Sequence, residues 1–188
     1  MRRKKSSPLE VIIWISILVF LALVLTFPKW ITFFYPKPHS EIVFAEAGKN
    51  NIDPYLVFAI MRTESKYQTA AESSAGARGL MQIMPDTAFW IAKQKGINNF
   101  DITSLYDPEV NIAFGCWYLA DLSREYKGNL PLVIAAYNAG RGNVREWLNE
   151  GRWNGNLKEL DKIPFPETRT YVRNVLKAYE AYKAIYEE

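Results

Sequence analysis

Residues 53–64 read DPYLVFAIMRTE, and their pattern predicts a helix that lies inside a folded domain. Asp53 is a suitable N-cap, and Pro54 suits the first helical position. The next six residues, 56–61, are apolar on every side of such a helix. A helix without a polar face belongs in a core.

Glu64 is the candidate catalytic residue of this helix. It follows Met61 by three residues and Val57 by seven, so its carboxylate leaves the helix on a face that is otherwise core. Burial raises the pKa of a carboxyl group, and an acid that is still protonated near neutral pH can donate a proton to a leaving group. We therefore expect Glu64 to act as a general acid.

The loop that follows this helix is rich in small residues. Residues 73–82 read SSAGARGLMQ, so the backbone can approach a ligand closely there, and Gln82 adds a polar amide. This loop predicts one wall of a cleft.

Two later segments place polar groups at helix ends. AYNAG at 136–140 ends an apolar helix, and read from its own residues it is a helix C-cap with a core tyrosine. IPFPETRTYV at 163–172 is stiffened by two prolines and leads into a last helix. Glu167 is favourable near that helix N-terminus whatever its function.

The basic charge of the chain lies mainly near its start. The 188 residues carry a formal charge of +3, but five cations surround the first apolar stretch against one acid, Glu10: Arg2, Arg3, Lys4, Lys5 and Lys29. The rest is close to neutral, so the charge gives no argument for nucleic acid. Cys116 and His39 are each the single residue of their type, so the sequence predicts no metal site, no cofactor and no internal disulfide.

Residues 11–27 contain no charge, Gly or Pro and are a candidate membrane helix. The basic start keeps the N-terminus in the cytoplasm by the positive-inside rule and places the remainder outside. We expect a cytoplasmic basic tail at 1–8, a transmembrane signal-anchor helix at 9–30, a linker at 31–40 and one folded domain at 41–188. A cleaved signal peptide is the alternative, but no convincing cleavage site follows the apolar run.

Helical patterns account for the rest of the chain. Pro28 is expected to end the first helix, and Gly48 is expected to end a second one that Ser40 caps. No stretch alternates with a period of two long enough to demand a sheet. The expected fold class is all-α.

Four blocks together resemble the lysozyme-like lytic transglycosylases, the catalytic-domain family of soluble lytic murein transglycosylase, which is similar to goose-type lysozyme. They are Glu64-Ser65, GARGLMQIMP at 76–85, AYNAG at 136–140 and IPFPETRTYV at 163–172. The resemblance runs from about Ser40 to the C-terminus. One departure is Gln68-Thr69, where the family often has Asn-Pro, and we expect it to alter only a turn.

The resemblance implies a membrane-anchored bacterial enzyme that cleaves peptidoglycan glycan strands between N-acetylmuramic acid and N-acetylglucosamine. Glu64 would act as acid and then as base, forming a 1,6-anhydro sugar without water. The substrate-binding residues that it implies are Ser65, Ser73, Met81, Gln82, Tyr137, Asn138, Glu167 and Tyr171. A cell-wall synthesis or division complex is a partner that the resemblance leaves open, and no residue identifies it.

Two alternatives remain at this point. A muramidase of the same fold would use water and leave a reducing end, so the product separates the two readings. Glycoside hydrolysis usually takes two carboxylates, and the nearest candidates for a second one are Glu72, Asp86 and Glu167. A peptidoglycan-binding module without turnover would have no need of Glu64.

Overall fold

The structure is a computed structural model that describes residues 7–187, and the chain forms two units, Met1–Pro36 and Lys37–Glu188. The first unit contains α1 (Pro8–Phe34), which Ser7 and Glu10 cap reciprocally through side-chain bonds to each other's backbone N–H groups. The part from Pro8 to Thr26 is long and apolar enough to cross a membrane, and all of its side chains are exposed. Four of the five cations noted near the chain start lie outside the described residues.

The prediction that Pro28 ends this helix is wrong, because α1 continues to Phe34. A proline inside a helix removes one backbone hydrogen bond, and the apolar residues on both sides still favour the helix.

The second unit is built from helices, and no strand occurs between residues 7 and 187. Only isolated bridges join Arg78 to Glu72 and to Ile83. The all-α prediction is therefore confirmed. In chain order the elements are α2 (Ser40–Asn50), α3 (Pro54–Glu64), α4 (Pro85–Gln94), the 3-10 turn η1 (Ile102–Tyr106), α5 (Pro108–Glu125), α6 (Leu130–Ala139), α7 (Arg141–Asn149), the 3-10 turn η2 (Leu157–Lys162) and α8 (Pro166–Tyr186).

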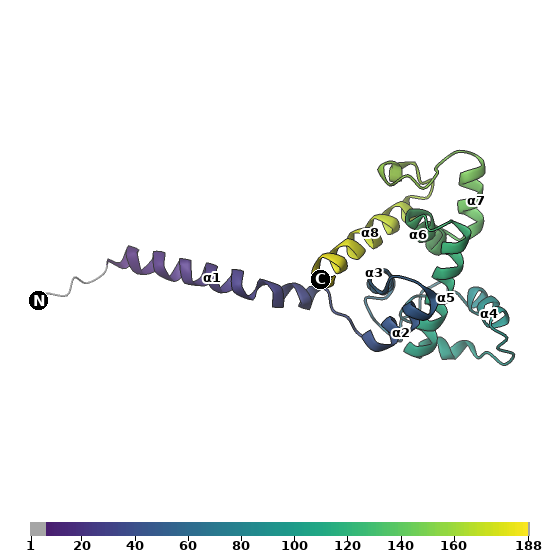
Figure 1. Ribbon diagram of the computed structural model, residues 1–188, viewed down its shortest axis with the longest axis horizontal. Helices are drawn as coiled ribbons and strands as arrows, with labels where there is room; N and C mark the ends of the chain where they lie inside the picture. Colours follow the sequence, from purple (N-terminus) through teal and green to yellow (C-terminus); the bar gives the residue numbers. More distant parts are fainter. Residues whose placement is uncertain (1–6, 188) are drawn as a thin grey trace, which may run out of the picture. The chain divides into compact units, whose positions relative to one another are not determined.

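Helix α3 is the centre of this unit, as its sequence predicts. The side chains of residues 56–61 are all buried, and the helix packs against α8 and α2 (Figure 1). Asp53 caps α3 by accepting from the N–H of Tyr55 at 2.8 Å. Its other carboxylate oxygen accepts from the hydroxyl of Tyr179 at 2.6 Å, so the cap also ties α3 to α8.

Helix α2 runs past Gly48, so the prediction that this glycine ends the helix is wrong. Ser40 is the first residue of the helix and not its cap, because His39 occupies the N-cap position, without a side-chain hydrogen bond. Asn51 ends it instead, in a left-handed conformation with φ of 53°. Its N–H reaches the carbonyls of Ala47 and Gly48, which closes the last turn without a glycine.

The aromatic core lies beside these helices. Trp147, Trp153 and Cys116 are buried, whereas Trp90 and Trp117 are half-buried and in edge contact. His39 lies in the 31–40 segment that the sequence predicts to be a linker, but it is half-buried at the start of α2 because the helical unit begins two residues earlier, at Lys37.

Candidate functional site

Glu64 is the last residue of α3, and it is half-buried where this helix meets α8. The hydroxyl of Tyr171 donates to Glu64 Oε1 at 2.6 Å. Burial raises the pKa of Glu64 to about 7, opposed by the Tyr171 hydrogen bond and assisted by the nearby charge of Glu167. Near neutral pH, Glu64 is therefore divided between an acid and a base.

Tyr171 remains a neutral donor in this pair. It lies in the second turn of α8, and its side chain is buried. Burial and the charge of Glu64 hold the pKa of Tyr171 well above its ordinary range. The hydroxyl can therefore support either protonation state of the carboxyl group without losing its own proton.

The loop between α3 and α4 is held in place by Asn111, a fully buried residue of α5. Its side-chain oxygen accepts from the N–H of Met81 at 2.8 Å, and its amide nitrogen donates to the carbonyls of Arg78 and Leu105. Gly79 is required here because its φ is +74° and a Cβ would lie 2.2 Å from Asn111 Nδ2. The buried Asn111 amide therefore fixes the loop at 73–82, whose small residues predict one wall of a cleft.

Met81 connects this wall to α5 and α6. Its sulfur packs against Gly115 of α5, only 2.1 Å from the position that a Cβ on this glycine would occupy. Its carbonyl accepts from the hydroxyl of Tyr137 at 2.9 Å. Burial raises the pKa of Tyr137 well above its ordinary range, and the charge of Glu64 adds to this shift, so the tyrosine lies within the field of the acid.

Three predicted site residues make hydrogen bonds within or across the wall. Gln82 has φ of 48°, and its amide nitrogen donates to the carbonyls of Ala71 and Gly79. The Ser65 hydroxyl is buried and donates to Leu80 at 2.8 Å, which joins the end of α3 to the loop. The Ser73 hydroxyl accepts from the N–H of Ala77 at 3.0 Å and serves the loop itself.

Asn138 follows Tyr137 near the end of α6 and is oriented by α8. Its side-chain oxygen accepts from the hydroxyl of the buried Thr168 at 2.7 Å. This bond occupies the oxygen and turns the NH₂ group away from Thr168, so Asn138 is presented as a donor.

Cavities follow one another along the end of α6. One of about 250 Å³ is lined by Gln82, Tyr118, Tyr137 and Asn138, among others. It shares Asn138 and Ala139 with a cavity of about 420 Å³ that Glu167 also lines. On its other side it shares Tyr118 and Gly140 with a cavity of about 440 Å³. We call this series the α6 groove, and its elongated form suits a chain-like ligand.

Glu64, Tyr171, Tyr137, Asn138 and Glu167 are thus brought to one region from α3, α6 and α8. The residues that sequence reasoning missed are Asn111, Thr168 and Tyr118. Asn111 had a readable signal, because it is a polar residue on an otherwise apolar face of its helix. Thr168 and Tyr118 are defined by their tertiary partners and carry no such signal.

Metal ligands do not gather in this region. Across residues 7–187, no group of three or more His, Cys, Asp or Glu side chains is placed to hold a metal ion. Burial raises the pKa of the Cys116 thiol to about 12, so it is a core side chain and not a thiolate ligand.

Comparison with known proteins gives relatives over most of the chain. The putative soluble lytic murein transglycosylase of Haemophilus influenzae is 36% identical over 173 residues, which are 92% of this chain and 29% of that protein. The membrane-bound lytic murein transglycosylase C of Actinobacillus pleuropneumoniae serotype 5b is 34% identical over 167 residues, covering 78% of this chain and 46% of that protein. The chain therefore spans less than half the length of these relatives.

A solved structure matches the fold as well. It is the lytic transglycosylase Slt of Pseudomonas aeruginosa, described as an inactive mutant with Gln in place of a Glu. The TM-score is 0.74 at 38% sequence identity, and the match covers 80% of this chain and 24% of that one.

Family descriptions match two consecutive parts of the chain. Residues 41–159 match the transglycosylase SLT domain, and residues 162–188 match the soluble lytic transglycosylase helical domain. Because the first match covers more than half of the chain, the protein belongs to the transglycosylase SLT-domain family.

Proposed function

We propose that this protein is a membrane-anchored lytic transglycosylase of peptidoglycan, with Glu64 as its single acid and base. The observation that carries the proposal is the Glu64 carboxyl group, half-buried, hydrogen-bonded to Tyr171 and with a pKa of about 7. Family membership and the names of its relatives support the substrate class.

The reaction has two proton transfers, and Glu64 performs both. In the first, the protonated carboxyl group donates to the glycosidic oxygen between N-acetylmuramic acid and N-acetylglucosamine, and the bond to the anomeric carbon breaks. The N-acetyl group of the muramic acid stabilises the electron-deficient anomeric carbon. In the second, the Glu64 carboxylate takes the proton of the C6 hydroxyl, whose oxygen closes the 1,6-anhydro ring.

A pKa near 7 suits both steps, since the acid and base forms are then equally populated at neutral pH. Tyr171 can donate to the carboxylate after the first transfer, which stabilises the charge that the acid leaves behind. The attacking hydroxyl belongs to the same sugar, so its effective concentration is high.

Two of the other candidate carboxylates, Glu72 and Asp86, support a one-acid mechanism by their surroundings, whereas Glu167 is the candidate second acid of the hydrolytic alternative. Glu72 is exposed and accepts from the hydroxyl of Tyr106 at 2.6 Å. Asp86 lines the cavity of about 440 Å³ in the α6 groove. Glu167 is exposed beside the groove, and its charge acts on Glu64, so it is the residue that a hydrolytic muramidase would use as its base.

Mass spectrometry of fragments released from purified peptidoglycan tests this proposal. The full chain in detergent should release muropeptides that end in 1,6-anhydro-N-acetylmuramic acid, and Glu64→Gln should release none. Fragments heavier by one water, with a reducing end, would instead make the protein a muramidase. Equal release by the Glu64→Gln variant would exclude Glu64 as the acid, and no release by either protein would favour a binding module.

We further propose that α1 anchors the protein in the bacterial cell membrane, with the N-terminus cytoplasmic and the helical domain outside. The apolar exposed helix and the membrane-bound relative support this assignment. The full chain should stay in the membrane pellet after alkaline extraction, and protease added to spheroplasts should digest the helical domain. Release of the chain by alkali, or protection from the protease, would contradict the anchor or its orientation.

A further inference from the structure

The chain reverses its direction immediately after Glu64. Helix α3 ends at this residue, and Ser65 follows as its C-cap. Lys66 and Tyr67 then have φ of 51° and 68°, two consecutive left-handed residues of which neither is a glycine. Residues with a side chain rarely adopt such angles, so the surrounding structure must stabilise them. The reversal that ends α3 is therefore strained.

The hydrogen bonds within the reversal are long. The carbonyl of Met61 accepts from the N–H and the hydroxyl of Ser65, both at 3.2 Å, and from the N–H of Tyr67 at 3.4 Å. The N–H of Gln68 donates to the carbonyl of Ser65 at 3.1 Å. Because one carbonyl serves three donors at these distances, backbone bonds alone hold the reversal weakly.

The side chain of Tyr67 connects the reversal to α8. Its hydroxyl is hydrogen-bonded to the hydroxyl of Tyr182, which we call the hydroxyl pair. Tyr182 is fully buried, and its ring stacks on that of Phe58 in α3 with centroids 5.5 Å apart. Phe58 precedes Glu64 on the same helix, so Tyr67 is folded back toward the α3–α8 interface. The hydroxyl pair thus fastens the reversal to this interface.

Helix α8 therefore contacts both Glu64 and the segment that follows it. Tyr171 and Tyr182 are eleven residues apart, about three helical turns, so they lie on one face of α8. Tyr171 donates to the Glu64 carboxyl group at 2.6 Å, whereas Tyr182 holds the residue three positions after Glu64. One contact acts on the carboxyl group, and the other acts on the backbone that carries it.

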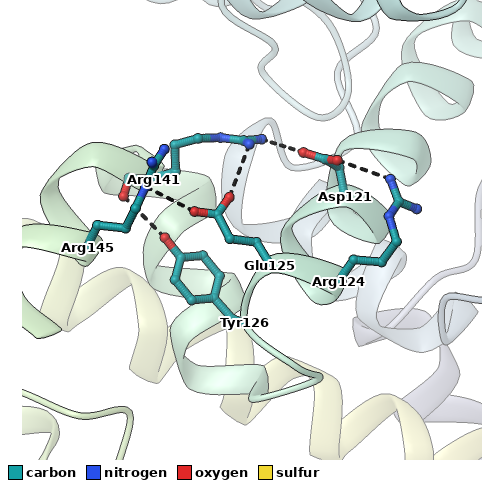
Figure 2. A network of polar contacts seen from close by, with 6 residues as sticks. All are labelled: Asp121, Arg124, Glu125, Tyr126, Arg141 and Arg145. Atoms are coloured by element: carbon teal, nitrogen blue, oxygen red, sulfur yellow. Dashed lines mark hydrogen bonds and ion pairs between the residues drawn. The ribbon is translucent and has the colours of Figure 1, made fainter.

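The polar network between α5 and α7 is of a different kind (Figure 2). Asp121 and Glu125 of α5 pair with Arg141 and Arg145 of α7 at distances from 2.6 to 3.1 Å. These charged side chains are partly exposed, and solvent and salt weaken such pairs. The network joins helices that do not carry Glu64, so it provides a control for the loss of an interhelical contact.

We propose that Tyr67 and Tyr182 are positioning residues for Glu64, because their hydroxyl pair holds the end of α3 where the carboxyl group stays buried against Tyr171. The inference rests on the proposed function for its effect on cleavage. The ionisation of Glu64, however, can be measured without turnover.

Loss of the hydroxyl pair should loosen the end of α3 and let water reach Glu64. Burial is the largest cause of the raised pKa of Glu64, so this pKa should fall toward 4.5. The ionisable groups that face Glu64 are Tyr171 and Glu167 of α8 and Tyr137 of α6, and a substitution at residue 67 leaves all three present. Removing the Tyr171 hydroxyl has the opposite sign, because its hydrogen bond lowers the pKa of Glu64.

Tyr67→Phe, which removes only the hydroxyl, is the first test. NMR titration of carbon-13-labelled glutamate side chains, on the full chain in detergent, should show the pKa of Glu64 about one unit below that of the parent. A fall from about 7 to roughly 6 lowers the protonated fraction at pH 7 about fivefold. The kcat on glycan strands should fall by the same factor, with little change in KM. Tyr182→Phe should have the same effect and the double variant no larger one, because all three remove one bond.

Lys66→Gly tests whether the hydroxyl pair acts through the reversal. Lys66 is exposed, and a glycine adopts φ of 51° without strain. The substitution should leave kcat of the parent unchanged and restore most of the kcat that Tyr67→Phe loses. Failure to restore it would overturn the role of the reversal.

Two controls remove interhelical contacts elsewhere. Tyr179→Phe breaks a 2.6 Å bond between α8 and Asp53 at the other end of α3, and Arg145→Met breaks a pair between α7 and α5. Both should leave the pKa of Glu64 and kcat unchanged. An unchanged pKa in Tyr67→Phe, or an equal fall in Tyr179→Phe, would overturn the inference. A lowered pKa in Tyr67→Phe, with a parent that releases no anhydro fragments, would overturn the proposed function alone.

Discussion

Tyr171→Phe removes the hydroxyl that donates to Glu64 at 2.6 Å and is expected to raise the pKa of this carboxyl group. A hydrogen bond to a charged group contributes about 1.5–3 kcal/mol, against about 0.5–1.5 kcal/mol for a bond between neutral groups. The ionised form therefore loses roughly 1.4 kcal/mol more than the protonated form, which corresponds to about one pH unit. The pKa of Glu64 should rise from about 7 to roughly 8.

Two assays measure this change. In the pH dependence of kcat/KM on glycan strands, the alkaline limb reports the group that must be protonated in the free enzyme, and it should move up by about one unit. An NMR titration of carbon-13-labelled glutamate side chains gives the pKa of Glu64 directly, even if the strands are not cleaved.

Tyr179→Phe is the control on the same helix. It also removes a tyrosine-to-carboxylate hydrogen bond of 2.6 Å, but to Asp53, so it should lower stability without moving the pH profile. Glu167→Gln should move the limb in the opposite direction, because the charge of Glu167 raises the pKa of Glu64. An unchanged or lowered pKa of Glu64 in Tyr171→Phe would refute the reasoning.

Three further substitutions have defined outcomes. Above pH 7, Glu64→Gln should raise the free energy of unfolding in urea by roughly 3 kcal/mol, because folding raises the pKa of Glu64 from 4.5 to about 7 and the ionised carboxylate destabilises the folded state. Near pH 4.5 the carboxyl group is protonated in the folded state, so the substitution should leave this free energy nearly unchanged. An equal gain at both pH values would contradict this. Asn111→Ala should lower the same free energy by about 3 kcal/mol or more, because a fully buried side chain loses three hydrogen bonds. A loss below about 1 kcal/mol would show that other contacts hold the loop. Thr168→Val should lower kcat/KM about tenfold by freeing the Asn138 amide, with a change of about 1 kcal/mol in stability; unchanged kcat/KM would remove Asn138 from the site.

Local sequence rules were sufficient where an N-cap residue and a following proline mark the start of a helix. Asp53 caps a helix that begins with Pro54, as the pattern predicts, and Asp107 caps α5 before Pro108 in the same way. Pro28 and Gly48 do not end their helices, although a proline or a glycine commonly marks a helix terminus. Tolerance of a proline or glycine depends on the residues around it, and Asn51 supplied the left-handed turn that was expected of Gly48.

The buried acid could be predicted from periodicity, but its partner could not. Glu64 shares a face with Met61, whereas Tyr171 lies 107 residues away and reaches it only because α8 packs on α3. Gln82 is the opposite case, because its place in the wall could be predicted from the sequence but the orientation of its amide could not. Its amide was expected to face the cleft, and the structure has its nitrogen bonded to two carbonyls of its own loop, so its oxygen is the group left to the cavity that it lines.

The stability of the site and its chemistry are linked through one carboxyl group. Lowering the pKa of Glu64 would stabilise the folded protein at neutral pH but would leave too little acid to protonate the glycosidic oxygen. Raising it further would leave too little base for the C6 hydroxyl. Burial and Glu167 raise the pKa of Glu64 while Tyr171 lowers it, and the balance lies near 7. The surrounding wall must supply the stability that the ionised acid removes. A variant that weakens the wall and exposes Glu64 lowers the folded pKa of this carboxyl group toward 4.5, so we expect it to lose less stability at alkaline pH than at acid pH.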